Sequence, residues 1–173
     1  MDGTHMETKL QDRYPNAPRS DTVDAGHAFE DYACDRIAES GITLRTYKSA
    51  AMQLGVGESR AGFEFKLDAG HRRYGHLSIE VAERRRASGL WVPSGIFRDD
   101  NTWLYIQGDT SLFWVLFKPA LIARARRGGI TELFIIAEAA QPPVFESFGT
   151  VRKFYLPPAE ADLLGKRYEG TAP

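Results

Sequence analysis

Apolar and polar residues alternate strictly in two short stretches near the middle of the chain. In FEFKLD (63–68) and again in LSIEVA (77–82), the large apolar residues stand at odd positions. Because successive side chains of a strand point to opposite faces of a sheet, each stretch predicts a β-strand with one face in the core. The segment around Gly70 to Gly75 predicts a loop, so we expect the two strands to form a hairpin.

The same patterning predicts the remaining elements. Apolar residues at helical spacing indicate a first helix over 21–41, capped by Asp24. Further strands are predicted from β-forming residues at 42–47, 102–108, 111–117 and 130–139. Further helices, each with a proline near its start, are predicted at 118–129 and 157–168. This order predicts an α/β fold in which helices flank a mixed central β-sheet.

The first 20 residues differ from the rest of the chain. They are polar, contain two prolines and include GTHM, which resembles the remnant of an expression tag. We expect residues 1–20 to form a disordered arm. Residues 21–173 are then expected to form a single domain, which is an ordinary length for one core.

Composition limits the class of function. A net charge of −1 argues against a protein that is basic throughout and binds nucleic acid with its whole surface, although a local basic patch remains compatible. The single cysteine, Cys34, excludes an internal disulfide and a cysteine-rich zinc site. No apolar run approaches the roughly 20 residues that cross a bilayer. We therefore expect a cytoplasmic protein without a membrane partner.

The polar face of the predicted hairpin concentrates charge. Glu64, Lys66 and Asp68 share it on the first strand and Glu80 on the second. With a loop centred near Arg73, Lys66 lies opposite Glu80. The simplest interpretation is a solvated face with a cross-strand Lys–Glu pair. However, acids of like sign repel, hard divalent cations prefer clustered carboxylates, and a lysine can stabilise charge that develops on a phosphoryl group. This favours a metal site.

The layout resembles the PD-(D/E)xK superfamily of restriction-endonuclease-like nucleases. AFEDYACDRIAESGI (28–42) is similar to the first helix of Holliday-junction resolvases and Mrr-type nucleases, with Glu30 eleven residues before Gly41. Segments between 53 and 109 also resemble a group of proteins common in phage genomes. The resemblance implies a restriction-endonuclease-like core and a Mg²⁺- or Mn²⁺-dependent nuclease that acts on DNA. It also allows a homodimer that cuts both strands, in the host cytoplasm if the protein is phage-encoded.

The resemblance assigns roles to the acids and the lysine. Glu64, Glu80 and Asp68 would hold the metal. Lys66 would position the nucleophile or stabilise the transition state. Glu30 would complete the shell directly or through a water. Glu58, which precedes the first strand, and Gln53 belong either to the edge of this site or to a loop.

One position departs from the superfamily pattern. The third motif is Glu-x-Lys, whereas this chain has Glu80-Val81-Ala82. One interpretation is that Lys66 has taken over the lysine's role. Another is a catalytically decayed nuclease-fold module that binds nucleic acid without cutting it. A third is a different α/β domain whose acidic face only solvates a sheet.

Two groups of arginines are candidates for contact with DNA. Arg84, Arg85 and Arg86 follow the second strand of the pair, and Arg72 and Arg73 lie in the loop. A run of like charges is usually a solvated surface. Next to a metal site, however, it is also suited to hold a phosphate backbone.

Overall fold

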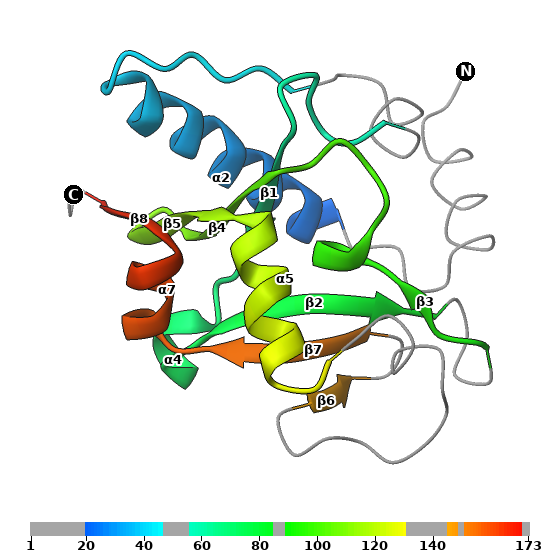
Figure 1. Cartoon of the computed structure of the whole chain (residues 1–173). Coiled ribbons are helices and arrows are strands. Elements are labelled where there is room, and N and C mark those ends of the chain that lie inside the picture. Colours follow the sequence, from blue (N-terminus) through cyan, green and yellow to red (C-terminus); the bar gives the residue numbers. More distant parts are fainter. Residues whose placement is uncertain (1–19, 47–55, 85–88, 131–144, 149–150, 171–173) are drawn as a thin grey trace.

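The structure is a computed structural model that describes residues 20–46, 56–84, 89–130, 145–148 and 151–170 (Figure 1). These segments form a mixed α/β fold with two four-stranded sheets and flanking helices. The elements in chain order are α2 (Ser20–Ala38), β1 (Phe63–Leu67), α4 (His71–Tyr74), β2 (Leu77–Glu83), β3 (Val92–Pro93), η1 (Gly95–Phe97), β4 (Leu104–Asp109), β5 (Leu112–Phe117), α5 (Lys118–Arg127), β6 (Phe145–Phe148), β7 (Val151–Leu156), α7 (Pro158–Leu164) and β8 (Gly165–Glu169).

The first sheet has the order β1-β4-β5-β8 and is mixed. β1 runs parallel to β4, with Phe63 beside Leu104. β4 and β5 form a hairpin, and β8 pairs antiparallel with the far side of β5. Gly165 opens β8 against the backbone of Val115, where an added Cβ would lie 2.1 Å from a carbonyl oxygen. A side chain at position 165 would therefore push the two strands apart.

The second sheet has the order β3-β2-β7-β6 and is antiparallel throughout. Its central pair, β2 and β7, joins residues that lie 68 to 79 positions apart in the sequence, from Glu83 with Val151 to Leu77 with Leu156. The register shifts between Glu80 and Ala82, which marks a β-bulge in β2. Both Val81 and Ala82 are buried at this irregularity.

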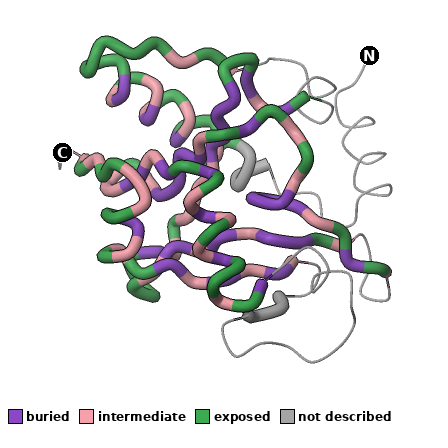
Figure 2. The backbone as a smooth tube through the Cα atoms, in the orientation of Figure 1, coloured by how far each residue is buried: buried purple, intermediate pink, exposed green. Residues whose placement is uncertain are grey.

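Apolar residues cover both faces of the first sheet. One cluster packs α2 against one face, and α2 lies along that side in Figure 1. Its buried members are Phe29, Ala33, Ile37, Phe63, Phe65, Ile106 and Phe113. A second cluster fills the space between the other face, the second sheet, α5 and α7. Successive residues of β4 and β5 enter different clusters, as strand alternation requires, and buried segments run through both sheets in Figure 2.

The structure confirms the predicted strands of the central region and the helix that follows them. Residues 63–67, 77–83, 104–109 and 112–117 are strands, and α5 begins at Lys118 with a proline in its first turn. The predicted helical stripe of α2 is buried as well. The side chains of β1 and β2 that were predicted to face the core also do so.

The predicted hairpin of β1 and β2 is wrong. The two strands belong to different sheets, and β1 pairs with β4 instead. The connection between them contains the helical turn α4, and its first residue, His71, is buried. The segment between β1 and β2 is therefore packed into the protein, and it directs β2 into the second sheet. Alternation predicted the faces of the strands, but it contains no information on the pairing partner.

Three smaller expectations also fail. Residues 42–46 form no strand, and Asp24 lies inside α2 because the helix begins at Ser20. The last helix ends at Leu164, and the chain continues as strand β8. The predicted strand at 130–139 lies, apart from Ile130, outside the described residues, as does the predicted arm apart from its last residue. The strands β6 and β7 were missed. Within the described segments, every helix is too short or too polar to span a lipid bilayer.

Candidate functional site

A pocket of about 190 Å³ lies at the seam where β1 and β4 of the first sheet meet β2 and β7 of the second. Its lining residues come from both sheets and from η1: Lys66, Leu67, Asp68, Ser78, Ile79, Glu80, Ile96, Tyr105, Gln107 and Lys153. Lys66 and Glu80 therefore line one pocket, although they come from different sheets and not from one hairpin.

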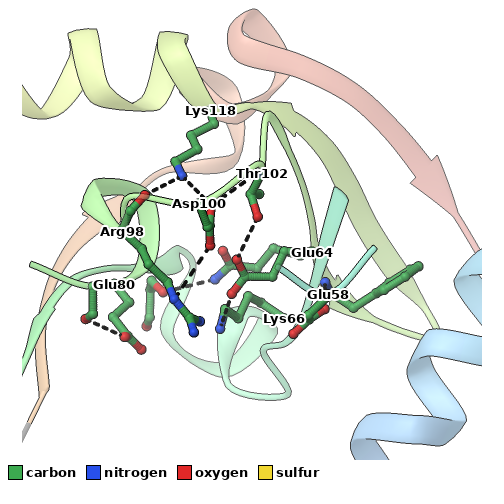
Figure 3. A network of polar contacts seen from close by, with 12 residues as sticks. Glu58, Glu64, Lys66, Glu80, Arg98, Asp100, Thr102 and Lys118 are labelled. Carbon is green, nitrogen blue, oxygen red and sulfur yellow. Dashed lines mark hydrogen bonds and ion pairs between the residues drawn. The ribbon is translucent and has the colours of Figure 1, made fainter. Parts of the chain in front are cut away.

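Glu64 and Lys66 form the centre of the polar network at this seam (Figure 3). The Glu64 side chain is 2% exposed, and its Oε1 lies 2.5 Å from Lys66 Nζ. The Thr102 hydroxyl donates to Glu64 Oε2 at 3.4 Å. Burial disfavours the charge on Lys66, but the carboxylates of Glu64, Glu80 and Glu58 outweigh it and raise the pKa of the ammonium. Lys66 is therefore a cation at neutral pH.

Glu80 provides a second acid on the pocket wall. The Ser94 hydroxyl donates to Glu80 Oε1 at 2.6 Å, which fixes the carboxylate from the loop before η1. Lys153 on β7 lies beside Glu80 in the strand register and also lines the pocket. The pocket is thus lined by two acids, Asp68 and Glu80, and two lysines, and Glu64 adds a third acid through its ion pair with Lys66.

Asp68 lines the pocket, but its carboxylate is hydrogen-bonded to the backbone of β2 and to a side chain of β4. Its Oδ2 accepts hydrogen bonds from the Ser78 N–H at 2.7 Å and from Gln107 Nε2 at 3.1 Å. Gln107 Nε2 also donates to the Ser78 carbonyl at 3.0 Å. Asp68 and Gln107 together therefore satisfy the backbone of Ser78 and join the first sheet to the edge of β2.

Glu58 and Glu30 lie next to β1 and do not line the pocket. Glu58 Oε2 accepts a hydrogen bond from the Phe65 N–H at 2.7 Å, which satisfies a donor of β1. Burial raises the pKa of Glu58 to about 7, against the lowering effect of that bond, and nearby Glu64 adds to the increase. Glu30 of α2 contributes to the negative field at Glu58. The structure thus places Glu30 near Glu58 and outside the pocket lining.

Sequence reasoning missed a second buried ion pair that supports the site. Asp100 Oδ1 lies 2.9 Å from Lys118 Nζ and accepts the Thr102 N–H at 2.9 Å (Figure 3). Burial alone would raise the pKa of Asp100, but the Lys118 hydrogen bond and the Thr102 N–H lower it. Lys118 also donates to the Arg98 carbonyl at 2.8 Å. These bonds hold Thr102 where its hydroxyl reaches Glu64.

Two uncharged side chains of β4, Tyr105 and Gln107, were missed as well. Both are buried and face the pocket from the strand beside β1. Burial, with a further contribution from nearby Glu64, raises the pKa of the Tyr105 hydroxyl, so this group remains a neutral donor. The polar residue within an otherwise apolar strand was the only local signal for Gln107.

The position of the expected motif lysine points away from the pocket. Ala82 is 0% exposed and belongs to the core cluster between the sheets. The bulge after Glu80 turns it inward, so a long charged side chain at 82 would enter the core. The two lysines that line the pocket, Lys66 and Lys153, come from β1 and β7 instead.

Two carboxylates, those of Glu64 and Glu80, are candidates to bind a cation, and they do not form a complete coordination sphere. Among the residues that the structure describes, no three Asp, Glu, His or Cys side chains converge in a way that could hold a metal ion. Mg²⁺, however, is usually held by one or two carboxylates together with waters and substrate phosphates. Glu80, whose Oε1 accepts from Ser94, lines the pocket and is the first candidate for such a partial ligand set. Glu64 is a second candidate, but Lys66 and Thr102 already engage both of its oxygens, just as two framework hydrogen bonds occupy Oδ2 of Asp68.

The candidate DNA-binding arginines lie outside the pocket lining. Arg72 and Arg73 are exposed on α4. Arg84 lies over the ring of Trp91, with 4.4 Å from its guanidinium carbon to the ring centroid. Arg152 of β7 contacts the same ring at 4.2 Å. Arg85, Arg86 and Gln53 lie outside the described residues.

Comparison with protein-family models, curated proteins and solved structures finds no match for this chain. The similarity to the PD-(D/E)xK superfamily is therefore a resemblance of short motifs.

Proposed function

We propose that this pocket hydrolyses phosphodiester bonds in DNA with the help of Mg²⁺ or Mn²⁺. The observation that supports the proposal is the placement of Glu64 and Glu80 within electrostatic reach of one lysine, at a polar pocket between two sheets. Glu64 and Glu80 would hold the ion. A divalent ion supplies an activated water and neutralises phosphate charge. The restriction-endonuclease-like core remains part of this proposal.

Lys66 is suited to stabilise the charge that develops on the phosphate. Its pKa is raised, so it keeps all three ammonium protons at neutral pH. One N–H can remain on Glu64 while another is donated to a phosphate oxygen. Tyr105, as a neutral hydroxyl, and Lys153 are further donors on the same wall.

A second candidate is a module that binds nucleic acid without cutting it. Two observations favour it: among the described residues no set of three metal-ligating side chains converges, and Glu64 is already paired with Lys66. In this case the two lysines of the pocket would contact a phosphate, and the acids would serve to position Lys66.

Replacement of Glu80 by Gln separates the two candidates. Gln keeps the size of the side chain and an acceptor for Ser94, but it removes the charge that a cation requires. For the nuclease, we expect Glu80→Gln to abolish cleavage of labelled DNA in Mg²⁺ or Mn²⁺ and to weaken Mn²⁺ binding at least about tenfold.

Glu83→Gln is the matched control because Glu83 is exposed at the end of the same strand. It should cleave and bind Mn²⁺ like the wild type. DNA binding by the wild type without cleavage in either metal would favour the binding module. Cleavage by Glu80→Gln at the wild-type rate would contradict the assignment of this site.

A further inference from the structure

We infer that Tyr74, the exposed ring of three packed aromatic side chains beside the pocket (Tyr74, His76 and Tyr155), binds single-stranded DNA by stacking on an unpaired base. We call these residues the aromatic strip. The inference rests on the proposed nuclease function and specifies its substrate as DNA with a single-stranded segment.

The rings of the strip follow one another from α4 to the second sheet. Tyr74 and His76 are stacked, with centroids 6.1 Å apart and an interplanar angle of 26°. His76 and Tyr155 are 3.9 Å apart at 43°. Tyr74 is 62% exposed, and its ring lies close to Gly70, where an added Cβ would come within 3.1 Å of it. An exposed ring that is already packed against a neighbour such as His76 loses little side-chain entropy when a ligand stacks on it.

The strip leads directly to the pocket. Tyr155 lies beside Ser78 in the register of β2 and β7, and Lys153 lies beside Glu80. Phe154 between them faces the core, so Tyr155 and Lys153 share the outer face of β7. Residues on one face of a strand repeat at about 7 Å, which is close to the rise of two stacked nucleotides. A strand of DNA held at Tyr74 and running along the outer face of β7 would therefore reach Lys153 and the pocket.

The charges around the strip complement a phosphate backbone. Arg72 and Arg73 are exposed on α4, and the Arg73 guanidinium carbon lies 5.5 Å from the centroid of Tyr74. Lys153 provides a cation at the pocket end. Proteins that bind single strands typically combine such cations with aromatic platforms. A duplex offers the same phosphates but hides the faces of its bases, so stacking favours the single strand.

Binding measured without cleavage tests this inference separately from the enzyme activity. Fluorescence anisotropy in EDTA would compare a labelled single strand of about 20 nucleotides with the duplex of the same sequence. We expect the wild type to bind the single strand more tightly. Tyr74→Ala should weaken single-strand binding about five- to hundredfold, the loss typical of one stacked base, and leave duplex binding nearly unchanged. Tyr74→Phe, which keeps the ring, should bind like the wild type.

Phe117→Ala is the matched control because Phe117 is 45% exposed at the end of β5 and does not line the pocket. It should leave both affinities unchanged. Equal affinity of the wild type for single strand and duplex, or equal single-strand binding by the Tyr74→Ala and Phe117→Ala proteins, would overturn the inference. Because EDTA removes divalent ions, this result is independent of cleavage, and the Glu80→Gln experiment can fail while the strip still binds a single strand.

Discussion

At the scale of single residues, solvent exposure and nearby charges explain why a charged lysine is tolerated at position 66 and not at position 82. Lys66 is about one-third exposed, and its ammonium lies within reach of three acids, so its charge is stabilised. Ala82, in contrast, is fully buried and packed among apolar residues between the sheets. An unpaired ammonium in such surroundings loses its proton or forces the strand outward.

We therefore predict that Ala82→Lys, which restores the motif of the superfamily, destabilises the protein and does not increase cleavage. Burial of an unpaired lysine is expected to cost at least about 3 kcal/mol of unfolding free energy. Urea denaturation measures this loss. Glu83→Lys, one position further along β2 and exposed, should change stability by less than about 0.5 kcal/mol. Equal stability of the two variants would show that position 82 is open to solvent.

At the scale of the elements, sequence predicted faces better than partners. The alternation of β1 and β2 correctly separated core residues such as Phe63 and Ile79 from polar residues such as Lys66 and Glu80. It could not predict that β1 pairs with β4, because the packing of α4 redirects the chain between β1 and β2.

The residues that sequence reasoning missed share one property. Gln107, Lys118 and Lys153 each join the site through contacts with residues far away in sequence. Gln107 bonds to Ser78, 29 positions earlier, and Lys118 to Asp100, 18 positions earlier. No local motif encodes these contacts, since they exist only once the strands have paired. The acids and Lys66, in contrast, stand close together in the sequence.

The carboxylate of Asp68 links the end of β1 to β2 through the Ser78 N–H and to Gln107 of β4. Its removal should weaken the contact between the two sheets. Asp68→Ala leaves the Ser78 N–H without its acceptor, which is expected to cost about 1–3 kcal/mol. Hydrogen–deuterium exchange should show faster exchange at the Ser78 amide. Asp68→Asn keeps an acceptor oxygen and should exchange nearly as slowly as the wild type. Unchanged protection of Ser78 in Asp68→Ala would mean that this bond does not hold β2.

At the scale of the whole molecule, the pocket lies between two packed sheets, and the acids beside it determine how the stability depends on pH. The formal net charge is −1 at pH 7, so overall repulsion has little effect on stability near neutrality. Glu58 is different because burial, assisted by Glu64, raises its pKa from 4.5 to about 7. The folded protein therefore holds this proton more tightly than the unfolded chain does.

The direction of the pH effect follows from this difference. The stability contributed by protonated Glu58 is fully present below pH 4.5 and is lost as the pH rises through about 7. Asp100 and Asp109 act in the opposite sense, because hydrogen bonds that outweigh burial lower their pKa values. Their contribution is present above their ordinary pKa of 3.8 and is lost in stronger acid. These three groups together favour maximal stability in weak acid.

Glu58→Gln isolates the loss at higher pH, because Gln cannot ionise and yet keeps an acceptor for the Phe65 N–H. Between about pH 5 and about pH 8, the wild type should lose about 2–3 kcal/mol of unfolding free energy relative to this variant. Urea denaturation of both proteins across the range measures the difference, in which other titrating groups cancel. Glu83→Gln, an exposed acid on β2, should follow the wild-type profile. Parallel profiles for the wild type and Glu58→Gln would mean that Glu58 ionises equally readily in the folded and unfolded chains.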